Sequence, residues 1–84
     1  MTDVVQQLDQ ALELAEAGLK SEVKPLLDSI MSGSHTIEPE HIGLLVREAC
    51  HSISEVAKSH NQNAKAGFAR NDSAKVKQSL RAAP

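Results

Sequence analysis

The stretch "IMSGSHTIEPEHIGLLV", residues 30 to 46, divides the chain into two halves that carry the same hydrophobic pattern. Gly33 suits the left-handed conformation that often follows a helix. Beyond it, Thr36 can cap a new helix and Pro39 suits a first turn, while the glutamates on either side of Pro39 favour the positive end of the helix dipole. The stretch therefore predicts that one helix ends just before Gly33 and that another begins near residue 38.

Up to Ile30, the first residue of this stretch, apolar residues recur at spacings of three and four, which places them on one face of a helix. They are Val4, Val5, Leu8, Ala11, Leu12, Ala15, Leu19, Val23, Leu26 and Ile30. Gly18 costs about 1 kcal/mol in a helix interior, and Pro25 removes an amide donor. We expect the helix either to kink there, or to stop near Gly18 and restart with Pro25 in a first turn. Because the stripe keeps its phase, a kink or a tight re-entry is favoured over a loop that reorients the chain.

From Ile42, within the stretch, a second stripe of the same kind predicts a second helix, with Gly67 as its stop. Its members are Ile42, Leu45, Val46, Ala49, Ile53, Val56, Ala57, His60 and Ala64. The two arms would span residues 3–32 and 38–66, each about 44 Å long at 1.5 Å per residue. The sequence thus predicts an all-α protein whose first 67 residues form a long antiparallel helical hairpin.

A two-helix hairpin cannot enclose a core, and a chain of 84 residues with Phe68 as its only aromatic residue has little apolar bulk to spare. A second copy would supply the missing layer and give a homodimeric four-helix bundle. Alternatively, the hairpin completes the helical bundle of a different protein. Both alternatives predict a non-enzymatic interaction module, such as a small adaptor, regulator or chaperone-like subunit.

Residues 68–84 are expected to form a mobile basic tail, with a short helix possible after Asp72, because only Val76 and Leu80 offer it an apolar edge. Residues 1–60 hold ten acidic and four basic side chains, whereas residues 61–84 hold five basic side chains against Asp72 alone. Such asymmetry is typical of an interaction segment.

The basic tail supports an alternative function, a small nucleic-acid-binding regulator on a dimeric scaffold. The candidate residues are Lys65, Arg70, Lys75, Lys77 and Arg81. Deleting residues 68–84 would then abolish binding and leave the bundle intact. The competing interpretation is a solvated tail, or one that rests on the acidic body of a neighbour.

Apolar residues off the two stripes indicate where a protein partner would dock. Leu44 lies about 160° from the centre of its stripe, and Leu27 and Met31 lie on the outer flank of the first arm. All three are near the hairpin tip, where Gly43 would allow close backbone approach. We expect a docking patch there, unless these residues pack in the dimer or against the tail.

No catalytic, metal or cofactor site is predicted. His35, Glu38 and His41 form the one trio that could hold a metal, but a helix start explains the same residues more simply. Cys50 and His51 are helical neighbours whose side chains diverge by about 100°, so they do not form a thiolate–imidazole pair. The chain also has no Gly-rich phosphate loop.

The longest apolar run, "LLV" at residues 44 to 46, is far too short to cross a membrane. The N-terminus lacks the positively charged leader and apolar block of a secretory signal. The single cysteine, Cys50, fits a reducing compartment. We therefore expect a cytoplasmic protein.

Overall fold

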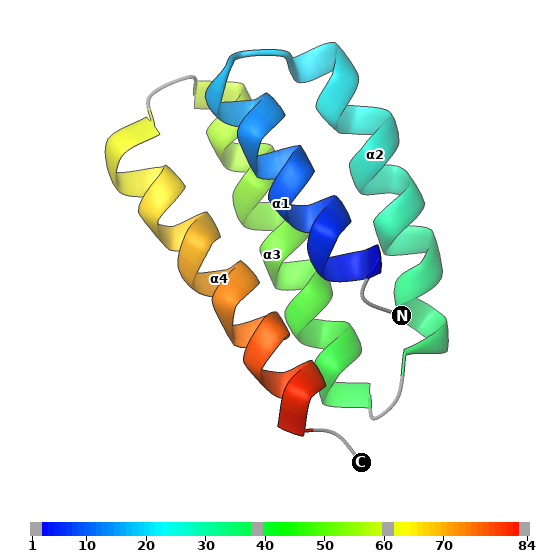
Figure 1. The fold of residues 1–84 in the computed structure, drawn as a ribbon. Coiled ribbons are helices and arrows are strands. Elements are labelled where there is room, and N and C mark those ends of the chain that lie inside the picture. Colours follow the sequence, from blue (N-terminus) through cyan, green and yellow to red (C-terminus); the bar gives the residue numbers. More distant parts are fainter. Residues whose placement is uncertain (1–2, 38–39, 60–61, 83–84) are drawn as a thin grey trace.

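The computed structural model describes residues 3–37, 40–59 and 62–82, which are almost entirely helical and contain no strand. Four α-helices follow one another: α1 (Asp3–Glu16), α2 (Lys20–Gly33), α3 (Glu40–Ser59) and α4 (Gln62–Ala82). A short 3-10 helix, η1 (Ser34–Thr36), follows α2 directly. Figure 1 shows the four α-helices side by side, each antiparallel to the one before it. The all-α prediction is confirmed.

The first arm is two antiparallel helices, because the chain reverses at Gly18. This glycine has φ of 80° and so occupies the left-handed region. Its N–H donates to the Ala15 carbonyl at 3.0 Å, and the Leu19 N–H donates to the Leu14 carbonyl at 2.9 Å. These two bonds form a Schellman motif, which satisfies the free carbonyls at the end of α1. The expectation that the chain would not reorient was wrong, since a tight turn can preserve the phase of a stripe while reversing its direction.

Pro25 lies inside α2 rather than in its first turn. Because Pro25 has no N–H, the carbonyl of Ser21, in the first turn of the helix, lacks its usual backbone donor. Both residues are exposed to solvent, so water can satisfy that carbonyl. Pro25 is therefore accommodated without ending the helix.

The second arm is also divided, because α3 ends at Ser59 and α4 begins at Gln62. The predicted stop at Gly67 lies inside α4, which continues to Ala82. The residues expected to form a tail thus belong mainly to a fourth helix, and the predicted boundary at residue 67 falls within that helix. His60, assigned to the second stripe, lies outside the described residues.

The central pair of the bundle is α1 and α3, each of which contacts the other three helices. In the described part of the chain, α2 and α4 do not contact each other. The core consists mainly of aliphatic side chains from all four helices: Leu8, Ala11, Leu12, Ala15, Val23, Leu27, Ile30, Val46, Ala49, Cys50, Ile53, Val56, Ala57, Ala69 and Val76. One chain therefore supplies four helices around one core, and no second copy is needed to cover that core. The homodimer stays a prediction.

Helix α4 joins the bundle with small side chains. Ala66, Ala69, Ser73 and Val76 are buried at spacings of three and four, which places them on one face. Small residues allow two helix backbones to approach closely, because little side-chain volume separates them. The Ser52 hydroxyl on α3 also donates to the Asp72 carboxylate on α4.

Complementary charge also holds α4. Helix α1 carries four acidic and no basic residues, whereas α4 carries five basic residues and one acidic residue. Nη2 of Arg70 lies 2.8 and 2.7 Å from the two carboxylate oxygens of Glu16. Nζ of Lys77 lies 3.7 Å from Oδ2 of Asp9. The positive charge that sequence analysis assigned to a tail thus lies beside the acidic α1 of the same chain.

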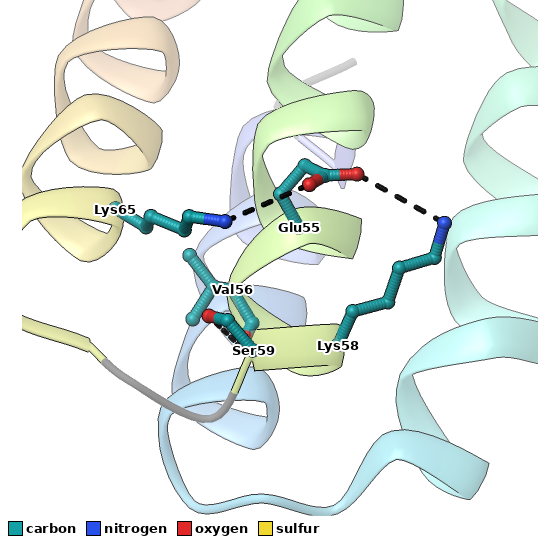
Figure 2. Close-up of polar contacts among 5 residues, drawn as sticks. All are labelled: Glu55, Val56, Lys58, Ser59 and Lys65. Carbon is teal, nitrogen blue, oxygen red and sulfur yellow. Dashed lines mark hydrogen bonds and ion pairs between the residues drawn. The ribbon is translucent and has the colours of Figure 1, made fainter.

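A third contact of this kind links α3 and α4. Figure 2 shows Glu55 between Lys65 of α4, at 3.7 Å, and Lys58 of α3, at 3.9 Å. Nearby, the Ser59 hydroxyl donates to the Val56 carbonyl at 3.5 Å, in the last turn of α3. The two ion pairs of Glu55 are largely solvent-exposed, so each contributes little stability, about 1 kcal/mol or less.

Candidate protein-docking surface

The end of the bundle where α2, η1 and α3 meet is organised by hydroxyl groups. The Ser34 hydroxyl donates to the Met31 carbonyl at 2.7 Å, and the Thr36 hydroxyl donates to the Gly33 carbonyl at 2.8 Å. Both bonds satisfy carbonyls at the end of α2. The Thr36 hydroxyl therefore serves the end of this helix. The sequence had suggested it as a cap for the next helix, but residues 38 and 39, where that helix was expected to begin, lie outside the described residues.

Gly43 and Arg47 of α3 hold this turn in place. A Cβ atom on Gly43 would lie 2.9 Å from the Ser34 carbonyl oxygen, so only glycine permits this approach without a shift. Nε of Arg47 donates to the Ser34 hydroxyl at 3.3 Å, and its Nη2 lies 2.9 Å from Nδ1 of His35. Because guanidinium groups only donate, His35 accepts through Nδ1. The close approach that sequence analysis predicted at Gly43 is made within the chain.

A hollow, which we call the tip hollow, lies over this turn. It is lined by Ser34, His35, Ile37, Glu40, Gly43, Leu44 and Arg47. Leu44 is 50% exposed at its edge. The tip hollow thus combines two charged side chains, Glu40 and Arg47, with one exposed leucine.

A second concavity, the α2/α3 groove, runs between these two helices. The buried part of its lining is apolar and consists of Val23, Leu27, Cys50 and Ala57. The exposed part is mostly charged or polar and includes Lys20, Lys24, Asp28, Met31, His51 and Lys58. Met31 is 42% exposed. A thioether of this kind can change rotamer to fit different neighbours.

The thiol of Cys50 reflects the apolar character of this groove. Burial raises the pKa of Cys50 from 9.0 to about 11, because the surroundings disfavour the thiolate. At neutral pH the side chain is therefore an uncharged thiol. It behaves as a small apolar group in the floor of the groove.

The four residues predicted as a docking patch are divided between these two concavities. Gly43 and Leu44 line the tip hollow, and Leu27 and Met31 line the α2/α3 groove. Leu44 and Met31 are exposed, whereas Leu27 is 6% exposed and belongs to the core. Its predicted position on an outer flank was wrong, because α2 turns back against α1 and α3. Their role in binding stays a prediction.

The five basic residues of the alternative function lie along α4 and differ in their surroundings. Lys65, Arg70 and Lys77 each lie beside a carboxylate of α1 or α3. Lys75 and Arg81 form no ion pair within the described part of the chain. A phosphate backbone along α4 would therefore meet carboxylates as well as cations.

Within the described ranges, no group of three or more histidine, cysteine, aspartate or glutamate side chains is placed to hold a metal ion. Of the trio considered from sequence, Glu38 lies outside these ranges, and Nδ1 of His35 is engaged by Arg47. None of the described helices combines the length and the apolar character needed to cross a membrane.

Sequence reasoning overlooked the cations of α2 and α3. Lys20 and Lys24 are four residues apart, a spacing that places them on one face of a helix. Arg47 follows Gly43 by the same interval on α3. With Lys58, these are the four basic residues within residues 1–60, and that scarcity was a signal available from sequence.

Comparison with known protein families, with characterised proteins and with solved structures found no match.

Proposed function

We propose that this protein is a non-enzymatic interaction module that binds another protein through the face formed by α2, η1 and α3. The observation that carries the proposal is the position of the exposed apolar side chains. Leu44 and Met31 are 50% and 42% exposed, and each edges a concavity of this face. Burying such side chains against a partner contributes on the order of 1.5 to 3 kcal/mol each.

The binding unit in this proposal is the folded four-helix chain, which docks as a preformed surface. A rigid surface loses little conformational entropy on binding. The adaptable element is Met31, at the end of the α2/α3 groove. The module would act by bringing its partner into contact with other components, as adaptors and regulators do.

Affinity capture from the native cell with three baits tests this function. Wild type is compared with the double variant Met31→Glu, Leu44→Glu and with Phe68→Glu as a matched control. Phe68 is an apolar residue that is 67% exposed on α4, so its substitution makes one apolar-to-glutamate change of the same kind outside the proposed face. We expect the double variant to lose its partner, and the control to keep it.

Purified partner then replaces the lysate in a titration by calorimetry. Circular dichroism confirms that each variant retains its helices. Partner retention by the double variant at wild-type affinity would contradict the proposal. Sedimentation of wild type at micromolar concentration tests the predicted homodimer separately, because a compact monomer would remove it.

The nucleic-acid alternative draws support from Lys75 and Arg81, which are free of ion pairs within the described residues. It predicts a complex with duplex DNA or RNA that weakens steeply as salt is raised. The double variant Lys75→Gln, Arg81→Gln should abolish it. If neither duplex shifts in a gel at low salt, this alternative is removed.

A further inference from the structure

The face formed by α2, η1 and α3 collects the positive charge of an otherwise acidic part of the chain. Residues 1–60 contain ten acidic side chains and four basic ones. All four basic ones, Lys20, Lys24, Arg47 and Lys58, line the tip hollow or the α2/α3 groove. The acidic side chains in the described lining are Glu40 and Asp28. A face of this sign attracts acidic partners and disfavours basic ones.

Two of the three lysines on the groove, Lys20 and Lys24, differ from Lys58 and from most cations of α4 because they form no ion pair with the described residues. Three of the five cations on α4 lie beside carboxylates of the same chain. By contrast, Lys20 and Lys24 form no ion pair with any other described residue. Both are exposed at the edge of the α2/α3 groove. Their charge is therefore available to a partner.

The floor of the groove is apolar and is formed by two neighbouring helices, which restricts the shape of the segment that can bind there. Leu27 and Cys50 form part of that floor, and Met31 lies exposed at one end. The ridges of two helices create grooves that accept the ridges of a further helix. The described residues offer no strand edge to which an extended peptide could add.

Resting on the proposed function, we infer that the α2/α3 groove binds an amphipathic helix of another protein whose apolar stripe is flanked by aspartate and glutamate. The stripe packs on Leu27 and Met31, and the flanking carboxylates pair with Lys20 and Lys24. From Lys20 to Met31 is eleven residues, or about 16 Å along α2 at 1.5 Å per residue. The bound helix would therefore contact the groove over about three turns.

The probe is a synthetic peptide of about 16 residues, long enough to form a marginally stable helix in water. It carries leucines at spacings of three and four with glutamates beside them, and a matched peptide carries glutamines in place of the glutamates. Binding of each fluorescently labelled peptide to the full chain is measured by anisotropy at low and high salt. We expect the acidic peptide to bind more tightly, and the difference to shrink as salt rises.

The variant Lys20→Glu, Lys24→Glu should weaken binding of the acidic peptide about tenfold or more at low salt, because the attraction becomes repulsion. Lys75→Glu makes the same kind of change on α4 and should have little effect. Met31→Glu should weaken both peptides. The proposal is overturned if wild type binds neither peptide, if it binds both equally, or if the lysine variant binds the acidic peptide as wild type does.

Failure of this inference can be separated from failure of the proposed function. If the lysine variant loses no affinity but the double variant Met31→Glu, Leu44→Glu still loses the native partner, the docking face stands and the acidic helix is wrong. If wild type self-associates in sedimentation and the lysine variant alone is monomeric, the groove binds a second copy, and the inference fails.

Discussion

Helices α3 and α4 lie antiparallel and are nearly equal in length, 20 and 21 residues, but they join the bundle by different means. Helix α3 buries large aliphatic side chains, including Ile42, Val46, Ile53 and Val56. Helix α4 buries alanines and a serine, with Val76 as its largest fully buried side chain. The Ser73 hydroxyl is buried without a hydrogen-bond partner in the described structure, a further cost that α3 does not share.

The difference shows how a helix with little apolar area can still belong to a core. Small side chains let α4 approach α3 closely, and its cations lie beside the carboxylates of α1 and α3. Neither feature would stabilise this helix in isolation. Helix α3 is thus buried because of its own large apolar side chains, whereas the burial of α4 depends on contacts that its neighbours supply.

Removing most of α4 is the strongest test of whether this helix is needed for the stability of the bundle. A chain ending at residue 67 lacks Ala69, Ser73 and Val76 and uncovers the apolar side chains of α1 and α3. We expect it to lose cooperative unfolding, as measured by circular dichroism during thermal denaturation. A truncated chain that unfolds as cooperatively as the full chain would support the sequence-based prediction that residues 68–84 can be deleted with the bundle left intact.

Truncating one buried side chain on each helix compares their contributions to stability. Ile53→Ala on α3 should lower the free energy of unfolding by about 2 to 5 kcal/mol, since it removes three carbons from a fully buried site. Val76→Ala on α4 removes two carbons and should lower it by about 1 to 3 kcal/mol. Urea denaturation measures both, and equal losses would mean that α4 is packed more tightly than its composition indicates.

The buried thiol gives α3 a dependence on pH that the buried serine of α4 lacks. The pKa of Cys50 is raised to about 11 in the folded chain from 9.0, so the thiol form is favoured by folding. Its stabilising contribution is complete below pH 9 and is lost as pH rises towards 11. The loss reaches about 3 kcal/mol. The stability difference between wild type and Cys50→Ala should shift by about 2 kcal/mol between pH 8 and 11, and a constant difference would contradict it.

Two glycines form a matched pair across the same helices. Gly43→Ala on α3 brings a Cβ to 2.9 Å from the Ser34 carbonyl oxygen, and should destabilise by about 1 to 2 kcal/mol despite the better helix propensity of alanine. Gly67→Ala on α4 meets no atom within 4 Å and should stabilise by about 0.5 to 1 kcal/mol. Thermal denaturation measures both. Opposite signs are expected, and a stabilised Gly43→Ala would show that the turn can shift.

The smallest expected effect concerns the ion pairs of α4. Arg70→Ala removes the contact with Glu16 and should lower stability by about 0.2 to 1 kcal/mol at low salt. The loss should decrease at about 1 M salt, where screening is strong. Lys75→Ala, which removes a cation without an ion pair to the described residues, is the control. Equal losses for the two variants would mean that the contact contributes nothing specific.

The sequence identified the helical faces well, because the spacing of apolar residues depends only on helix geometry. Leu8, Val46 and Ile53 were all placed on stripes and are all buried. Met31 and Leu44 were placed off the stripes on the same grounds, and both are exposed in the folded chain. Leu27 was misplaced because its face meets two helices rather than one.

The candidate docking surface was only half visible in the sequence. Its exposed apolar residues could be found as departures from the stripes. Its cations could not be assigned to one face, because Lys20 and Lys24 on α2 meet Lys58 on α3 only after the chain reverses. Charge that is separated in sequence becomes a single feature once the two helices are antiparallel.

By itself, the sequence determined that the chain is helical and which side of α1 and of α3 is apolar. These properties depend on the local periodicity and on helix-favouring residues. Only the tertiary structure decided that two expected arms become four helices and that residues 68–82 belong to the bundle. The physical reason is that reversal at Gly18 and burial of Ala69 and Val76 are favourable only when other helices are present to pack against them. The spacing of apolar residues within one helix does not indicate which other helices will pack against it.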